Sequence, residues 1–171
     1  LGLLSFILVL QLNWLTIILS VVALILAASY PFMKRVHMLP QVHLGLAFAW
    51  AIPMAYTALN NELHNASNWL IFITAVIWTT AYDTMYGMAD REDDLKLGLK
   101  STAILFGDND RLIVGLMQLT VVILLSILGA LESFGVIYYL GLFSASLFFV
   151  YQQYLIREYD RKLCFQAFLN N

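Results

Sequence analysis

The sequence predicts an all-α protein, a polytopic bundle of transmembrane helices, and three observations lead to this fold class. Of the 171 residues, 61% are hydrophobic and only 12% are charged, whereas soluble domains carry about 25% charged residues. Apolar runs of about 20 residues, the length that crosses a bilayer, follow one another along the chain. All nine Lys and Arg residues fall in alternate connections between these runs. The lipid bilayer is thus an expected partner, and nucleic acid is not, because the sequence has no basic patch.

The first half of the chain contains three apolar runs. Residues 1–12 are too few to span a bilayer, so we interpret them as the end of a truncated helix. Residues 14–33 form a full span that begins at Trp14, a residue type enriched at membrane interfaces. Residues 39–59 form the next span, and we expect a kink at Pro53 because proline interrupts the hydrogen bonds of a helix.

The second half of the chain contains three further runs, which we assign to the same single transmembrane domain. Residues 69–89 form a span that leads directly into an acidic stretch, and its apolar part, residues 69–82, contains no Gly or Pro to stop a helix. Residues 112–131 and 134–155 form two further spans joined by a short turn. The tail, residues 157–171, has the composition of the start of another helix.

The distribution of the basic residues predicts the orientation of the bundle. Three alternate connections contain all of them, and the intervening connections contain none. Because cytoplasmic loops carry the excess of Lys and Arg, these connections and the acidic stretch are expected on the cytoplasmic side. The basic residues are Lys34 and Arg35, then Arg91, Lys96, Lys100 and Arg111, and finally Arg157, Arg161 and Lys162.

The acidic stretch at residues 82–101 is the most informative part of the sequence, because it holds five of the eleven carboxylates. If the preceding helix continues, Asp83, Asp90 and Asp94 are spaced i, i+7 and i+11 and share one face. Asp90 and Asp94 repel each other at this spacing unless a cation lies between them. Hard oxygen ligands suit Mg²⁺, which keeps several waters and shares its shell with phosphates. We therefore predict that Asp90 and Asp94 bind Mg²⁺.

A solvated acidic loop is the alternative interpretation of this stretch. It accounts for Glu92 and Asp93, which point away from the shared face. It does not account for Asp83, which lies within the apolar register, where a carboxylate is costly and usually marks a functional interior.

Several other side chains are candidates for the same site. Tyr30 and Lys34 are four residues apart on one helical face and form the pair we favour first. Tyr86 lies between the acids on the helix. Lys and Arg residues at the cytoplasmic ends of helices are required for topology in any case, so roughly half of the basic residues could be there for orientation alone. The cationic candidates for binding an anionic substrate are Arg35, Lys96 and Lys100.

Other residue types give no site. His37, His43 and His64 have no spacing that links them into a metal set, so we interpret them as structural. Ser101 and Cys164 have no base near them in the sequence, and no phosphate-binding glycine motif is present. An ion pair of small value between Asp90 and Arg91 is a structural alternative, but it leaves Asp94 and Asp83 unexplained. Gln152 and Gln153 lie near the cytoplasmic end of the last span, where interfacial hydrogen bonding explains them.

The acidic stretch resembles a known motif. Its form, YDxxYxxxDxxDDxKxGxKSTA over residues 82–103, is similar to the second aspartate-rich motif of the UbiA superfamily of intramembrane aromatic prenyltransferases. Within that family it is most similar to the branch that prenylates 4-hydroxybenzoate in ubiquinone biosynthesis. The sequence YPFMKR at residues 30–35 resembles the family's YxxxK element. The resemblance extends over essentially the whole chain.

This resemblance implies a nine-helix bundle around a central cavity that opens to the cytoplasm, in the bacterial inner membrane. It implies Mg²⁺-dependent transfer of a polyprenyl group from polyprenyl diphosphate to 4-hydroxybenzoate. On matching positions, Asp90 and Asp94 hold Mg²⁺ against the diphosphate, and Asp83 lies deeper, near the acceptor. Catalytic roles fall to Asp83, Tyr30 and Lys34, and substrate-binding roles to Arg35, Tyr86, Lys96 and Lys100.

One departure from the family pattern affects the expected activity. The family's first aspartate-rich motif, NDxxDxxxD, has no counterpart, because no Asp precedes Asp83 and Glu62 is the only earlier acid. We therefore expect the sequence to be a piece of a longer protein, without the N-terminal helices and the last helix. Such a piece holds about half of the metal site and is expected to be inactive alone.

Two alternative functions stay open at this point. A transporter or channel also uses intramembrane acids to bind a cation, and it predicts inverted repeats and helices interrupted at the midplane. No internal repeat is evident, and the acids cluster near one interface. A prenyltransferase for a different acceptor differs only in its pocket.

Overall fold

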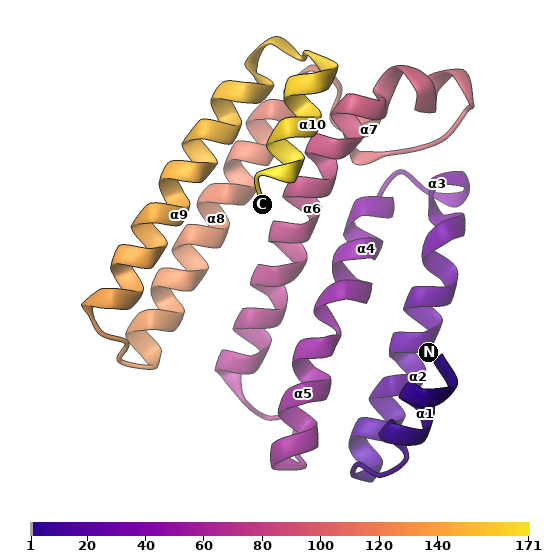
Figure 1. The fold of residues 1–171 in the computed structure, drawn as a ribbon, viewed down its shortest axis with the longest axis vertical. Coiled ribbons are helices and arrows are strands. Elements are labelled where there is room, and N and C mark those ends of the chain that lie inside the picture. Colours follow the sequence, from indigo (N-terminus) through magenta and orange to yellow (C-terminus); the bar gives the residue numbers. More distant parts are fainter. Residues whose placement is uncertain (1) are drawn as a thin grey trace.

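The computed structural model describes residues 2–171, and this part of the chain contains helices and no strands (Figure 1), which confirms the predicted fold class. The longer helices run side by side and are joined by short connections. The helices are α1 (Gly2–Val9), α2 (Trp14–Ser29), η1 (Tyr30–Phe32), α3 (Met33–Val36), α4 (Pro40–Ala49), α5 (Ala51–Asn60), α6 (Ala66–Lys96), α7 (Thr102–Phe106), η2 (Gly107–Asn109), α8 (Asp110–Leu131), α9 (Val136–Leu155), η3 (Ile156–Glu158) and α10 (Arg161–Leu169).

Four helical stretches are long and apolar enough to cross a membrane: Trp14–Val36, Pro40–Asn60, Thr102–Leu131 and Val136–Glu158. The chain is therefore an integral membrane protein, as its composition predicts. The 31-residue helix α6 is not among the four, because Thr, Asn and Asp residues interrupt its apolar surface. This composition suits its position, since α6 packs against α4, α5, α7, α8 and α10 and is largely surrounded by protein.

Helix α6 continues without a break from its apolar part into the acidic stretch and ends at Lys96, and the absence of Gly and Pro from residues 69–82 predicts this continuation. The Asn65 side chain caps its first turn by accepting a hydrogen bond from the Asn68 backbone, which satisfies a free N–H group. At its end, Gly98 adopts φ = +65°, a conformation that favours glycine. This turn lets the Leu99 N–H donate to the Asp94 carbonyl at 2.8 Å.

Small and flexible side chains allow the other helices to approach α6 closely. Ala81 and Met85 are fully buried and pack with Val114 of α8 and with Cys164 and Ala167 of α10. In a bilayer the lipid tails are as apolar as these side chains, so helix association depends on close packing and hydrogen bonds. This packing fixes α10 against the half of α6 that carries the acids.

The kink expected at Pro53 is present as a break between α4 and α5 at Trp50. Pro53 has no N–H to donate to the Ala49 carbonyl, so the regular ladder is interrupted there. The Trp50 indole N–H donates to the Leu19 carbonyl at 2.9 Å, which ties the break to α2.

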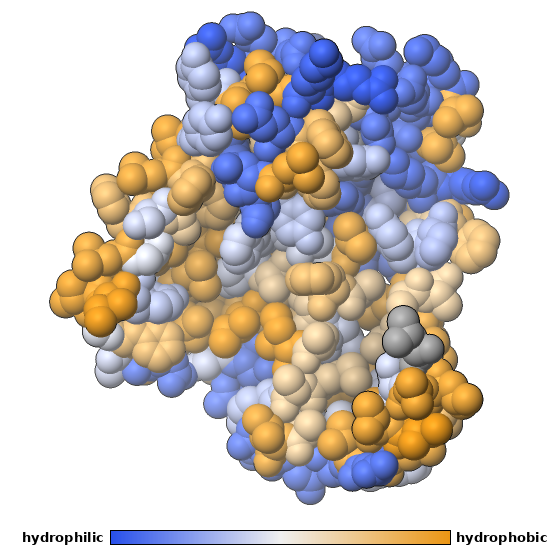
Figure 2. All heavy atoms as spheres, in the orientation of Figure 1, coloured by the Kyte–Doolittle hydropathy of each residue, from blue (hydrophilic) through white to orange (hydrophobic). Residues whose placement is uncertain are grey.

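The polar parts of the molecule gather at one end of the bundle. Helices α3, α7 and α10, the C-terminal end of α6 and the start of α8 all lie at this end (Figure 1). All nine basic residues belong to these elements, to η3 or to the α6–α7 connection. Figure 2 shows the hydrophilic surface concentrated there, above a largely hydrophobic surface on the spanning helices.

Candidate active site at the polar end of the bundle

The helical path of α6 places Asp83, Asp90 and Asp94 on one face, which we call the acidic ridge. Because α6 is unbroken, the i, i+7 and i+11 spacing holds in the structure. Asp94 is buried, with 4% of its surface exposed, whereas Asp83 and Asp90 are half-buried. Carboxylates this close together need nearby cations, since the repulsion between them destabilises the helix.

Lys34 of α3 supplies the first of these cations. Its ammonium Nζ donates to both oxygens of Asp94, at 3.2 and 3.0 Å. Its charge also acts on Asp83, further along the ridge. Tyr30, which precedes Lys34 by one helical turn, is half-buried, and its hydroxyl lies within the electrostatic influence of Asp83. The structure therefore brings Tyr30 and Lys34 to the acidic ridge.

The α6–α7 connection is held against α3 by Lys100. Its backbone N–H donates to the Lys34 carbonyl at 2.8 Å, and its ammonium donates to the Val36 carbonyl at 3.0 Å. Lys100 thereby fixes the position of Lys34, and its own charge is directed to the backbone of α3. The structure thus gives Lys100 a positioning contact beside the ridge.

Two other predicted substrate-binding cations are not brought to the ridge. Lys96 is 71% exposed and pairs with Asp93 at 3.4 Å, on another face of α6. Arg35 is exposed, and within residues 2–171 it forms no ion pair. Both lie at the rim of the polar end.

The segment that follows Lys100 packs tightly over α6. Ser101 caps α7 by accepting from the Ile104 N–H at 3.2 Å. The Thr102 N–H donates to Gln41 of α4 at 2.9 Å, and the Thr102 and Thr84 hydroxyls share a hydrogen bond of 2.7 Å. A Cβ atom at Gly87 would lie 3.2 Å from the Gln41 amide nitrogen, so a small residue is needed at this contact. These polar residues are structural and hold α4, α6 and α7 together.

Arg161 of α10 supplies a second cation on the other side of the ridge. One of its guanidinium nitrogens lies 2.8 Å from an Asp93 oxygen and 3.9 Å from an Asp90 oxygen. The hydrogen bond from Arg161 lowers the pKa of Asp93, which lies beyond the apolar part of α6. A pocket of about 410 Å³ opens beside this contact, lined by Tyr86, Ala89, Asp90, Arg161, Lys162 and Phe165.

Aromatic side chains extend from this pocket along α6 and α10. Phe168 lies 5.1 Å from Tyr86 and 5.9 Å from Tyr82, measured between ring centroids. Phe165 lies 6.1 Å from Tyr86. We call these four residues the aromatic wall. An aromatic ring presents a negative face that attracts cations, so the wall can stabilise positive charge next to the carboxylates.

The residues of the ridge fit part of a Mg²⁺ site. Among residues 2–171, no three His, Cys, Asp or Glu side chains converge as a complete metal cluster. Asp90 and Asp94 are one turn apart on one face, and Mg²⁺ is commonly bound by one or two carboxylates together with waters and substrate phosphates. The donor set therefore fits a metal that arrives with a diphosphate. Binding of Mg²⁺ by Asp90 and Asp94 stays a prediction.

Sequence reasoning missed the contribution of α10. It treated Arg161 only as a determinant of orientation and did not single out Phe165 or Phe168. A local signal was present: Asp160 caps the helix by accepting from two backbone N–H groups at 2.9 Å. After this cap, Arg161, Phe165 and Phe168 are spaced i, i+4 and i+7, which places them on one face.

The structural alternative of an ion pair between Asp90 and Arg91 is wrong. Arg91 does not pair with Asp90; it pairs with Asp110, which is fully buried at the start of α8. Adjacent residues on a helix point in different directions, so an Asp90–Arg91 pair is geometrically disfavoured.

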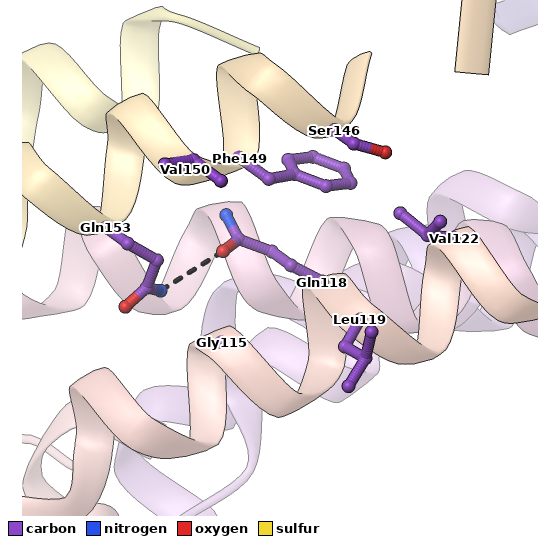
Figure 3. A pocket seen from close by; sticks show the side chains of 8 residues that line it. All are labelled: Gly115, Gln118, Leu119, Val122, Ser146, Phe149, Val150 and Gln153. Atoms are coloured by element: carbon purple, nitrogen blue, oxygen red, sulfur yellow. Dashed lines mark hydrogen bonds between the residues drawn. The ribbon is translucent and has the colours of Figure 1, made fainter. Parts of the chain in front are cut away.

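Gln152 of α9 is buried and Gln153 is half-buried, and both form hydrogen bonds with α8. Gln118 of α8 donates to Gln152 at 2.7 Å and accepts from Gln153 at 3.1 Å. Figure 3 shows Gln118 and Gln153 pointing toward one another beside a mostly apolar pocket of about 330 Å³. Hydrogen bonds between amides join helices in a membrane, so these glutamines form a structural contact between α8 and α9.

Comparison with known proteins places these features in a family context. The model of the UbiA prenyltransferase family matches residues 1–171. The chain is 59% identical over 169 residues to a 4-hydroxybenzoate octaprenyltransferase of Tolumonas auensis, covering 99% of this chain and 59% of that protein. It is 57% identical over 171 residues to the protein of that name in Aeromonas salmonicida, covering 100% of this chain and 59% of that protein. The chain thus spans about three fifths of the length of these curated relatives.

A solved structure has the same fold. The apo structure of a UbiA homologue from Aeropyrum pernix K1 matches with a TM-score of 0.76 and 24% sequence identity, over 96% of this chain and 64% of that chain. At this identity, the likeness concerns the arrangement of the helices.

Proposed function

We propose, from the premise that this chain belongs to the UbiA prenyltransferase family, that the full-length protein transfers a polyprenyl group from polyprenyl diphosphate to the aromatic ring of 4-hydroxybenzoate. The observation that carries this proposal is the acidic ridge, with Lys34 on its buried carboxylate Asp94 and the aromatic wall beside it. The names of the relatives at 57–59% identity favour the same acceptor.

The ridge would bind the diphosphate end of the prenyl donor. Asp90 and Asp94 would hold Mg²⁺, which supplies charge stabilisation for the departing diphosphate when it is bound. Lys34 would donate hydrogen bonds to the diphosphate oxygens, where negative charge develops as the C–O bond breaks. Tyr30 would orient the same group from the turn before Lys34.

The aromatic wall would face the allylic cation left on the prenyl chain. Tyr86, together with Phe165 and Phe168, offers ring faces that stabilise a cation. The space in front of the aromatic wall must also exclude water, which would otherwise quench the cation. A lipid-embedded bundle meets that condition and admits a long prenyl chain from the bilayer.

Asp83 would act on the acceptor. The acceptor ring attacks the allylic cation with electron density from its phenol oxygen, and a carboxylate assists by removing a proton. Asp83 lies on the ridge two turns deeper than Asp90, close enough for its charge to act on Tyr30, which suits this role.

The exposed cations would attract the anionic substrates. Arg35 and Lys96 lie at the rim, and a basic rim raises the local concentration of anions. By the positive-inside rule, this end faces the cytoplasm, and we propose the bacterial inner membrane as the location. The substrates would then reach the site from the cytoplasmic side.

Assay of the full-length protein in vesicles tests this function. With polyprenyl diphosphate, 4-hydroxybenzoate and Mg²⁺, we expect a prenylated acid as product, and we expect EDTA to abolish its formation. Readdition of Mg²⁺ should restore the activity. Lack of product under these conditions would contradict the proposal, and uptake of a labelled solute without prenyl diphosphate would support the transporter alternative.

Asp83→Asn in the full-length protein should lower kcat by roughly 10²–10⁴-fold, the usual contribution of a proton-transfer group. The affinity for prenyl diphosphate should be largely kept, because the amide retains the size of the carboxylate and the Lys34–Asp94 ion pair is unchanged. Steady-state kinetics with each substrate varied in turn separates these effects. A defect confined to KM for the diphosphate would argue against a proton role.

A further inference from the structure

We propose that Arg161 of α10 is a second diphosphate-binding cation, which faces Lys34 across the acidic ridge. This inference rests on the proposed function and adds to it a substrate contact from a segment outside the two motifs. It makes α10 part of the diphosphate site and assigns the pocket lined by Tyr86, Asp90, Arg161 and Phe165 to the diphosphate end of the prenyl donor.

The position of Arg161 is determined by the start of α10. Tyr159 adopts φ = +57°, which reverses the chain after η3. Asp160 then caps α10, so Arg161 is its first residue. The helix runs along α6 in the opposite direction, because Arg161 lies near Asp93 and Asp90 while Phe168 lies near Tyr82. Arg161 therefore reaches the same turn of α6 that carries the proposed metal ligands.

The ridge has one cation on each side. Lys34 donates to both carboxylate oxygens of Asp94, and Arg161 lies 3.9 Å from Asp90 while it pairs with Asp93. Mg²⁺ held by Asp90 and Asp94 would compensate the charge of these carboxylates, so Lys34 would become available to the diphosphate oxygens. Arg161 would exchange its pair with Asp93, which lies off the ridge, for the diphosphate. A guanidinium group suits this contact, because its planar array of donors matches phosphate geometry.

A purely structural role for Arg161 is the competing explanation, in which its pair with Asp93 holds α10 in place. Other contacts already do this. Cys164 and Ala167 are fully buried against α6. At the other end of α10, Asn171 accepts from the Trp78 indole N–H at 3.0 Å, and Asn170 accepts from Gln152 at 3.4 Å.

The two explanations differ in what they predict for Asp93. If Arg161 binds diphosphate, Asp93 competes with the ligand, and Asp93→Asn should keep or increase diphosphate affinity. If Arg161 only holds α10, Asp93→Asn removes the same ion pair as Arg161→Gln and should give the same defect.

The experiment measures binding of inorganic pyrophosphate with Mg²⁺ to the full-length protein by calorimetry, together with steady-state kinetics. Arg161→Gln should weaken pyrophosphate binding at least about tenfold, because a hydrogen bond between charged groups is lost. It should raise KM for polyprenyl diphosphate and leave KM for 4-hydroxybenzoate nearly unchanged. Arg161→Lys should recover part of the affinity, since it restores the charge without the planar donors.

Arg157→Gln is the matched control. Arg157 lies in η3, pairs with Glu158 at 2.9 Å and stacks on Tyr154, away from the ridge. The Arg157→Gln substitution removes one positive charge from the same end of the protein, so a general effect of charge on pyrophosphate binding would appear in this variant as well. We expect its pyrophosphate affinity to equal that of the wild type.

Wild-type pyrophosphate affinity in Arg161→Gln would overturn the inference, and so would equal losses in Asp93→Asn and Arg161→Gln. Asp90→Ala separates this failure from failure of the proposed function. If Asp90→Ala loses Mg²⁺-dependent pyrophosphate binding while Arg161→Gln keeps it, the function stands and the role of Arg161 is wrong. A wild-type protein that neither binds pyrophosphate nor forms product would contradict both.

Discussion

Asp90→Ala in the full-length protein is expected to abolish prenyl transfer at saturating Mg²⁺, a loss of roughly 10³-fold or more, as for removal of a main electrostatic contact of a transition state. Asp90 lies on the acidic ridge between Asp83 and Asp94, where its carboxylate would hold the metal that stabilises the departing diphosphate. Product formation from polyprenyl diphosphate and 4-hydroxybenzoate, measured over a range of Mg²⁺ concentrations, tests this expectation.

Glu92→Ala is the control for this variant. Glu92 is an exposed carboxylate two residues further along α6 and lies off the ridge. Its removal changes the net charge of the same region by the same amount, and we expect near wild-type turnover. Wild-type turnover by Asp90→Ala itself would rule out the metal role.

Arg91→Met is expected to be the most destabilising substitution at this end of the bundle. Asp110 has no exposed surface, and its carboxylate pairs with the Arg91 guanidinium. Removing the cation leaves a buried charge without its partner, which costs about 3–5 kcal/mol. Arg91 also joins the end of α6 to the α7–α8 connection through the Gly107 carbonyl. Reversible denaturation in mixed micelles, followed by circular dichroism, measures the change in unfolding free energy.

The double variant Arg91→Met/Asp110→Asn tests the cause of this effect. It removes both charges together, so it should be more stable than Arg91→Met alone. Lys96→Met is the control for a basic residue near the same end, because the Lys96–Asp93 pair is exposed and contributes little. If Arg91→Met lowered the unfolding free energy no more than Lys96→Met, the buried Arg91–Asp110 pair would not contribute to stability.

The arrangement explains how the chain tolerates several carboxylates on one helix. The cations come from both sides of the ridge, Lys34 from α3 and Arg161 from α10, and each forms an ion pair with a carboxylate of α6. Lys100 secures α3 by hydrogen bonds to two of its carbonyls. The site is thus assembled from three segments that are far apart in the sequence.

Local rules predict the fold class and the ridge. Composition and the length of the apolar runs indicate a membrane bundle, because these properties depend on each segment alone. The 3.6-residue period places Asp83, Asp90 and Asp94 on one face wherever the helix continues, and α6 does continue. The break before Pro53 follows from the missing N–H of proline for the same local reason.

By itself, the sequence determined the long apolar helices and the shared face of the three carboxylates, since both follow from short-range geometry. Only the tertiary structure decided which cation meets which acid: Lys34 with Asp94, Arg91 with Asp110, and Arg161 with Asp93. It also decided that α10 lies along α6. The physical reason is that these pairs depend on how whole helices pack, and packing follows the summed contacts of many residues.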